Sequence, residues 1–130
     1  MDDQIKLHHI ALQCDNKEEA ILFYQDTLGF KETKTFFLSE SLTYSIFCLN
    51  HSVEVIVFQN DSLYVEVFIV PGKNEKTCAH TCLLVNDLIE FIDLCKKNHV
   101  DYYSVKKEDR NLWFVKDFSG NIFEMKEKII

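Results

Sequence analysis

Two histidines and two glutamates lie one each in four β-favouring stretches of the chain, and their donor atoms suit a metal ion. They are His9, Glu66, His80 and Glu124. Imidazole nitrogens and carboxylate oxygens form a mixed donor set that nickel, zinc, cobalt, manganese and iron all accept. Such a set leaves coordination positions for water or substrate, unlike a closed site of four cysteines. The residues therefore predict one divalent metal ion without choosing among these elements.

Side-chain parity supports this grouping, because successive residues of a strand point to opposite faces of a sheet. Each of the four stretches has a mostly aliphatic face, suited to packing under a helix, and a mixed face that carries one histidine or glutamate. Glu54 competes with Glu66 for its ligand position, although it shares a parity with Ile56 and Phe58. At this point the choice between the two glutamates stays open.

Other histidines and one cysteine near these stretches have different expected roles. His8 follows the parity opposite to that of His9, so we expect it to support the site or to lie at the surface. His51 and His99 fall at predicted turns and are expected to be solvated. Cys82 shares a face with His80, and we expect a buried, inert thiol because no cationic residue nearby in sequence would lower its pKa.

The last predicted strand-turn-strand, residues 112–125, presents Glu124 among apolar neighbours. Residues 117–121 have turn-forming types, and Gly120 is free to adopt a positive φ. A glutamate in such a strand needs a partner, because burying an unpaired charge is costly. The other ligand candidates could supply that partner.

The elements that must position these residues fall into two similar halves. For the first half we expect a strand at 5–13, a helix at 15–28 and β runs at 30–38, 43–49, 53–59 and 63–70. For the second half we expect a strand at 79–85, a helix at 87–98 and β runs at 101–106, 111–116 and 121–127. Asp15 with Glu18, and Asp87 with Glu90, have the spacing of capping boxes at the two helix starts.

The halves align with each other at an offset of 71 residues, which places His9 over His80 and Glu19 over Glu90. This internal duplication predicts an α+β fold of two tandem modules within a single domain, 1–130. We expect module one at about 4–71, a linker at 71–77 that holds the only proline, and module two at about 78–128. The first half has one β run more than the second, and the sequence does not say which run is extra.

Composition excludes several classes of partner. The chain has 130 residues, 47% of them apolar, which is enough for a real core. Its net charge of −7 and its single arginine, Arg110, argue against nucleic acid and anionic membranes as partners. The five cysteines show no CxxC spacing, so we expect reduced thiols and a cytoplasmic location. We expect neither a signal peptide nor a membrane span.

Several motifs, in order along nearly the whole chain, resemble the vicinal oxygen chelate superfamily, also called the glyoxalase/bleomycin-resistance/dioxygenase fold. They are residues 9–12, 23–30, 65–72, 79–88 and 114–124. The last is similar to the family's Asp-Pro-x-Gly-Asn-x-x-Glu ending, with Phe118 in place of the proline. The resemblance implies paired βαβββ modules that form a cupped, mostly antiparallel sheet with helices on its outer face. It also implies the ligands His9, Glu66, His80 and Glu124, and a homodimer that shares its sites.

Within that superfamily the four-residue ligand set most resembles lyases of the glyoxalase I type. The resemblance implies a hemithioacetal of a small 2-oxoaldehyde as substrate and an enediolate along the path, with Glu124 or Glu66 as the catalytic base. Alternatives are an acyl-thioester epimerase, a fosfomycin thiol transferase, or a metal-free protein that binds a small molecule such as an antibiotic. For a binding protein, the expected cleft is lined by aromatic residues: Tyr44, Phe47, Tyr64, Phe68 and Trp113.

Overall fold

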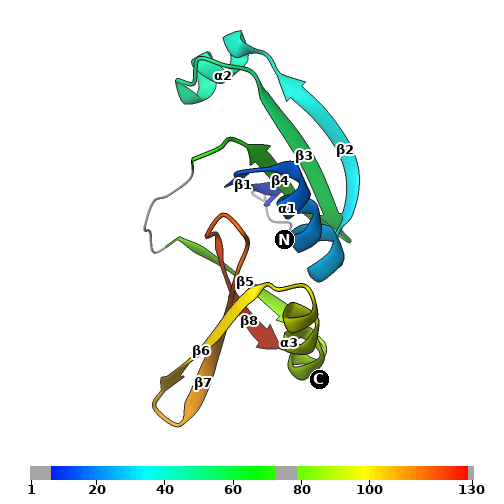
Figure 1. The fold of residues 1–130 in the computed structure, drawn as a ribbon, viewed down its shortest axis with the longest axis vertical. Helices are drawn as coiled ribbons and strands as arrows, with labels where there is room; N and C mark the ends of the chain where they lie inside the picture. Colours follow the sequence, from blue (N-terminus) through cyan, green and yellow to red (C-terminus); the bar gives the residue numbers. More distant parts are fainter. Residues whose placement is uncertain (1–6, 73–78, 129–130) are drawn as a thin grey trace, which may run out of the picture.

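The computed structural model describes residues 7–72 and 79–128, and it contains two βαβββ modules. Figure 1 shows the first module above the second along the long axis of the molecule. The first module contains β1 (His9–Cys14), α1 (Lys17–Ala20), η1 (Ile21–Thr27), β2 (Lys31–Leu38), α2 (Glu40–Phe47), β3 (Val53–Asn60) and β4 (Leu63–Ile69). The second contains β5 (His80–Val85), α3 (Leu88–Lys97), β6 (Asp101–Lys107), β7 (Arg110–Lys116) and β8 (Ile122–Glu127). The predicted α+β class and its two modules are confirmed, whereas most of the predicted linker lies outside the described residues.

The two sheets have equivalent strand orders, β1-β4-β3-β2 and β5-β8-β7-β6. In each, the first strand runs parallel to the last, and the remaining neighbours are antiparallel. β1 and β5 are therefore edge strands of their own sheets in the part of the chain that the structure describes. An edge strand presents unpaired backbone groups that another chain can use.

One face of each sheet, here called the back face, packs against the helices. Its residues include Val65 and Val67 of β4, and Phe123 and Met125 of β8, all at most 2% exposed. These side chains join Phe23 and other helix residues in a core cluster shared by both modules. The opposite face, here called the front face, carries the alternate residues of the same strands. In β1, β4, β5 and β8 each residue lies on the face that the alternation of the sequence predicts.

The expectation of a strand at 43–49 is wrong, because most of this stretch belongs to helix α2. The Ser39 side chain caps the helix by accepting the backbone N–H of Leu42, and Cys48 ends it with a positive φ of 60°. The Thr43 side chain is fully buried and its hydroxyl donates to the His51 carbonyl at 2.6 Å. These local hydrogen bonds and caps outweigh the β-favouring composition of the stretch. The extra β run of the first half is thus a helix, and both sheets have four strands.

The helix starts differ in how well the sequence located them. Asp87 caps α3 by accepting the backbone N–H of Glu90 at 3.0 Å, as predicted. In the first module the cap is Asn16, which accepts the N–H of Glu19 at 2.9 Å, one residue later than the expected Asp15. The expected helix at 15–28 is a turn of α-helix followed by the π-helix η1. None of the helices in the described ranges is long and apolar enough to cross a bilayer.

A buried carboxylate in the β7–β8 turn ties the modules together. Asp117 is 5% exposed and accepts hydrogen bonds from the Tyr24 hydroxyl at 2.8 Å and the Cys14 thiol at 3.2 Å. It also accepts the backbone N–H groups of Ser119 and Asn121 and the Asn121 side-chain amide. Burial, together with the negative charge of Asp117, raises the pKa of both Cys14 and Tyr24 well above their usual values. These groups therefore remain neutral hydrogen-bond donors at physiological pH.

Candidate metal centre

The first module pairs a histidine of its first strand with a glutamate of its last strand. In the parallel ladder Glu66 lies directly across from Ala11, two residues beyond His9, so the pair meets diagonally on the front face. His9 Nε2 lies 3.5 Å from Glu66 Oε1, and the two side chains are 38% and 23% exposed. Both groups are therefore reachable from solvent.

The second module repeats this pair in the same register. Glu124 lies directly across from Cys82, two residues beyond His80. His80 Nε2 lies 3.9 Å from Glu124 Oε1, and their side chains are 47% and 16% exposed. Lys126 places its Nζ 3.8 Å from the other oxygen of Glu124. The duplication thus extends from the sequence to the geometry of the two pairs.

The separations within the pairs suit a shared cation better than a direct hydrogen bond. Good N–H···O hydrogen bonds are about 2.7–3.2 Å long, shorter than both the 3.5 Å and the 3.9 Å separations. Two ligands that bind one metal at about 2.1 Å and at a tetrahedral angle lie about 3.4 Å apart. Each pair therefore has the donor chemistry, and nearly the spacing, of half a metal site.

The two pairs do not converge within one chain. Among residues 7–72 and 79–128, no three His, Cys, Asp or Glu side chains come close enough together to hold a metal ion. Each pair lies on its own sheet. The four residues expected as one ligand set are thus present as two half-sites, defined as His9–Glu66 and His80–Glu124.

His8, which lies just before β1, supports the first half-site. Its Nδ1 lies 2.9 Å from His9 Nδ1, and its ring stacks on Tyr64 with centroids 5.6 Å apart. One of the two nitrogens must carry the proton of this bond. With that proton on His9 Nδ1, the Nε2 lone pair of His9 is available to a metal. This contact fits the supporting role, one of the two roles expected for His8.

The competitor Glu54 lies away from both half-sites. It belongs to β3 and shares the back face with Ile56 and Phe58, which belong to the core cluster. Lys17 of α1 places its Nζ 3.2 Å from Glu54 Oε2. The helix supplies the partner of Glu54, whereas Glu66 faces His9.

The aromatic residues expected to line one cleft are distributed over several places. Phe47 and Phe68 meet edge to face with centroids 5.4 Å apart, and Tyr64 stacks on His8. Tyr44 is 63% exposed on α2. Trp113 lies across from Met125 on the back face and lines small cavities beside α3. Phe47 and Phe68 border a common cavity, together with Ala11, Gln13 and Leu49.

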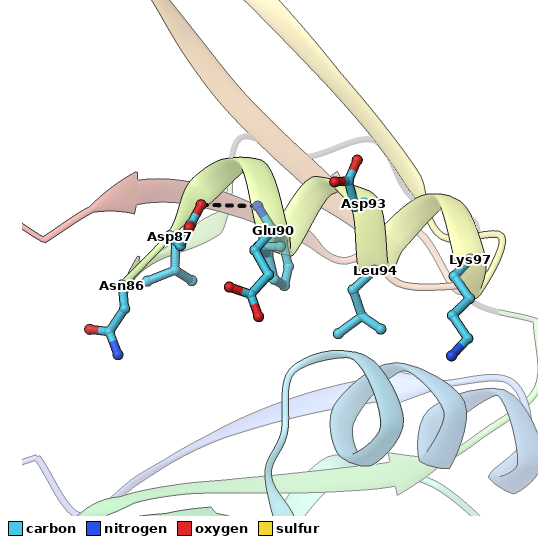
Figure 2. Close-up of a pocket in the computed structure, with 8 residues that line it drawn as sticks. Asn86, Asp87, Glu90, Asp93, Leu94 and Lys97 are labelled. Carbon is cyan, nitrogen blue, oxygen red and sulfur yellow. Dashed lines mark hydrogen bonds between the residues drawn. The ribbon is translucent and has the colours of Figure 1, made fainter.

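A cavity of about 520 Å³ lies away from the half-sites. It lies along α3 and is lined by residues that include Asp87, Glu90, Leu94 and Lys97. In Figure 2, Leu94 and Lys97 point toward the helix of the first module, and Asp87 caps α3 through Glu90. No histidine lines this cavity. Its acidic residues do not form a cluster that could hold a metal ion in the described part of the chain.

Cys82 departs from expectation, because the structure exposes it. It lies on the front face directly across from Glu124. Among the cysteines that the structure describes, Cys14 and Cys95 are buried, and Cys48 is exposed like Cys82. Parity located Cys82 correctly beside His80, but it did not reveal that the thiol is exposed.

Sequence comparison adds a family to this geometry. The pattern of the glyoxalase/bleomycin resistance protein/dioxygenase superfamily matches residues 6–125. The chain belongs to this superfamily. The match spans both half-sites, and it confirms the resemblance drawn from the motifs. No curated protein sequence matches the chain.

Solved structures of superfamily proteins share the fold. A glyoxalase family protein from Enterococcus faecalis has a TM-score of 0.72 and 18% identity, over 92% of this chain and 95% of that one. The fosfomycin resistance protein FosX from Listeria monocytogenes has a TM-score of 0.73 and 15% identity, over 97% and 95%. A glyoxalase family protein from Bacillus cereus has a TM-score of 0.74 and 13% identity, over 99% and 97%. At these identities the likeness concerns the fold alone.

Proposed function

We propose that this superfamily member is a metal-dependent enzyme that acts on a small molecule with two neighbouring oxygens, as in glyoxalase I-type isomerisation of a hemithioacetal. One observation carries the proposal. Both modules place a histidine and a glutamate in the same diagonal register, at 3.5 Å and 3.9 Å. A protein that only sequesters an apolar ligand has no use for such a duplicated donor pair.

The residues that would hold the metal are His9, Glu66, His80 and Glu124. The donor set suits a divalent ion, and a FosX structure from Listeria monocytogenes contains Mn(II). When bound, such an ion stabilises negative charge that develops on the substrate oxygens. Cytoplasmic location and the identity of the metal stay predictions.

A glutamate of the ligand set would move the proton. Glu66 and Glu124 each direct one carboxylate oxygen toward a histidine. The second oxygen of Glu124 lies 3.8 Å from Lys126, whereas no described lysine or arginine lies within 4 Å of Glu66. A carboxylate at this position can remove a proton from one carbon and return it to the adjacent one. The two candidates are separated by comparing Glu66→Gln with Glu124→Gln.

We propose further that two copies of the chain assemble each site. Within the described chain the half-sites lie on separate sheets, of which β1 and β5 are edge strands. A symmetric dimer can join the first half-site of one copy to the second half-site of the other. The dimer then holds two complete sites.

Metal content tests the proposal directly. Untagged wild-type protein is expected to bind about one metal per chain, and His9→Ala or His80→Ala is expected to lose it. Unfolding and remixing the two variants is expected to restore about a quarter of the sites, because half of the dimers are mixed and each mixed dimer has one intact site. Metal binding without restoration would place the site within one chain. No metal after dialysis against nickel, zinc or manganese would reject the enzyme and leave a binding protein.

Fosfomycin chemistry is the second candidate, and one observation favours it. Lys116 and Lys126 flank Glu124 on the front face of the second sheet, and they offer positive charge for a phosphonate. Metal-loaded protein is therefore assayed with methylglyoxal plus a thiol, and separately with fosfomycin with and without a thiol. Turnover of the hemithioacetal supports the first candidate. Turnover of fosfomycin, with or without the thiol, but not of the hemithioacetal supports fosfomycin chemistry.

A further inference from the structure

Helix α2 and the end of β4 form a small apolar cavity next to the first half-site. The cavity has a volume of about 270 Å³ and is lined by Ala11, Gln13, Phe47, Leu49 and Phe68. Ala11 lies directly across from Glu66, and Gln13 directly across from Phe68, so the cavity begins one pleat beyond the glutamate. Two residues along a strand span about 7 Å. A small molecule held at His9 and Glu66 can therefore reach it.

The lining of this cavity excludes charge. It contains no acidic or basic side chain, and its one amide is engaged, because Gln13 Nε2 donates to the Val70 carbonyl at 3.2 Å. Phe47 and Phe68 stand edge to face, with ring planes at 78°. Aromatic walls in this arrangement favour another flat ring. The chemistry of the cavity thus favours an uncharged aryl group.

Its size decides how much of a ligand it accepts. A sealed apolar cavity of about 150 Å³ is known to bind benzene in another protein, whereas whole ligand sites measure about 300–1,000 Å³. At about 270 Å³ this cavity holds one substituted ring but not a complete substrate. It is therefore a subsite, and the rest of the ligand must lie outside it, toward the half-site.

The wall formed by α2 is held in place and has no counterpart in the second module. Thr43 bonds to the His51 carbonyl, and Ser39 caps the helix. Where α2 joins β2 to β3, the second module joins β6 to β7 with a short turn at 108–109. Substrate selection by this wall would therefore come from the first module alone.

We propose that this aryl pocket, the cavity between Phe47 and Phe68, binds an uncharged aromatic substituent of the substrate while the vicinal oxygens lie at His9 and Glu66. The inference rests on the proposed function, because the half-site orients the other end of the ligand. It assigns the substrate to a class in which an aryl group is carried next to the chelating oxygens.

Two hydroxamates test the pocket on protein loaded with manganese. Benzohydroxamate and acetohydroxamate present the same two oxygens to a metal and differ in aryl versus methyl. Wild-type protein is expected to bind benzohydroxamate at least tenfold more tightly by calorimetry. Phe47→Ala is expected to abolish that preference while leaving acetohydroxamate affinity and metal content unchanged. Tyr44→Ala, on an exposed position of the same helix, is the matched control and is expected to keep the preference.

A metal-free probe separates failure of the pocket from failure of the proposed function. If the protein takes up no metal and acetohydroxamate does not bind, the metal site is rejected. Benzyl alcohol then still reports on the pocket, because it should shift the ring signals of Phe47 and Phe68 in nuclear magnetic resonance spectra. In Phe47→Ala the Phe68 signals should no longer shift. Equal affinity for the two hydroxamates, or benzyl alcohol that leaves both rings unshifted, would overturn the aryl pocket.

Discussion

The two modules share the register of their His–Glu pairs but differ in what surrounds each pair. His9 has His8 behind it and the aryl pocket beside it, whereas Glu124 has Lys126 beside it and the exposed Cys82 across from it. The first module connects β2 to β3 with a helix, and the second connects β6 to β7 with a short turn. The two modules thus share the His–Glu pair, whereas the residues that flank the pair differ. We expect the first module to recognise the substrate and the second to tune the charge at the site.

Substitutions in the turn before the last strand of each module, β3–β4 and β7–β8, should differ most in their effect on stability. Asp117→Asn puts an amide NH₂ among groups that all donate to Asp117. Because buried donors then lose their acceptor, the free energy of unfolding should fall by at least about 2 kcal/mol in urea titrations. Asp61→Asn, at the exposed β3–β4 turn, should change it by less than about 0.5 kcal/mol. Equal losses in the two variants would show that the turns are not different in this way.

The residues that flank the half-sites should act on metal affinity in opposite directions. His8→Ala removes the group that orients His9, and it should weaken metal binding about tenfold by calorimetry. His8→Gln retains an acceptor and should recover part of the loss. Lys126→Ala removes a cation near Glu124 and should strengthen binding a few-fold, because about 1 kcal/mol of repulsion between close charges disappears. Weaker binding in Lys126→Ala would instead assign that lysine to holding Glu124 in place.

Helix α2 offers a test that leaves the second module untouched. Thr43→Val keeps the buried shape but removes the hydroxyl that donates to the His51 carbonyl. The free energy of unfolding should fall by about 1 kcal/mol, and backbone amides of α2 should exchange hydrogen faster. Ser45→Ala, exposed on the same helix, is the control. Faster exchange in β6 and β7 as well would contradict an effect confined to the first module.

The buried thiols, one in each module, should differ in their pH dependence. Burial raises the pKa of Cys95 from 9.0 to about 11, so the unfolded chain ionises first as the pH rises. The stability that the neutral thiol contributes is complete below about pH 9 and is lost toward pH 11. The stability of wild type relative to Cys95→Ala should fall by about 0.8 kcal/mol between pH 8 and pH 9.5. For Cys14, whose pKa burial raises further, the loss should extend to more alkaline pH.

Parity and duplication predicted a large part of this arrangement. Alternation along β1, β4, β5 and β8 placed all four donor residues on the front face, and the offset from His9 to His80 predicted the repeated module. Such patterns are local, because strand geometry alone determines which face a residue occupies. The start of α3 was found for the same reason, since Asp87 and Glu90 lie within one turn of helix.

Two misses concern residues whose contacts their amino-acid types do not reveal. Residues 43–49 have strand composition, but 43–47 lie in α2. Ser39 caps this helix, Cys48 ends it, and Thr43 donates to the His51 carbonyl. Trp113 lies on the back face against α3, although its aromatic character suggested a cleft. Propensity and composition cannot report these contacts, because they depend on which segments meet after folding.

The sequence by itself determined the superfamily, the two modules and the front-face positions of His9, Glu66, His80 and Glu124, because motif order, repeat offset and parity are properties of neighbouring residues. Only the tertiary structure decided that Glu66 rather than Glu54 faces His9, that the donors form two half-sites, and that Asp117 joins the modules. These outcomes depend on side chains that lie far apart in the chain and meet only when sheets and helices pack. The diagonal register between β1 and β4, repeated between β5 and β8, is where the local pattern and the packing agree.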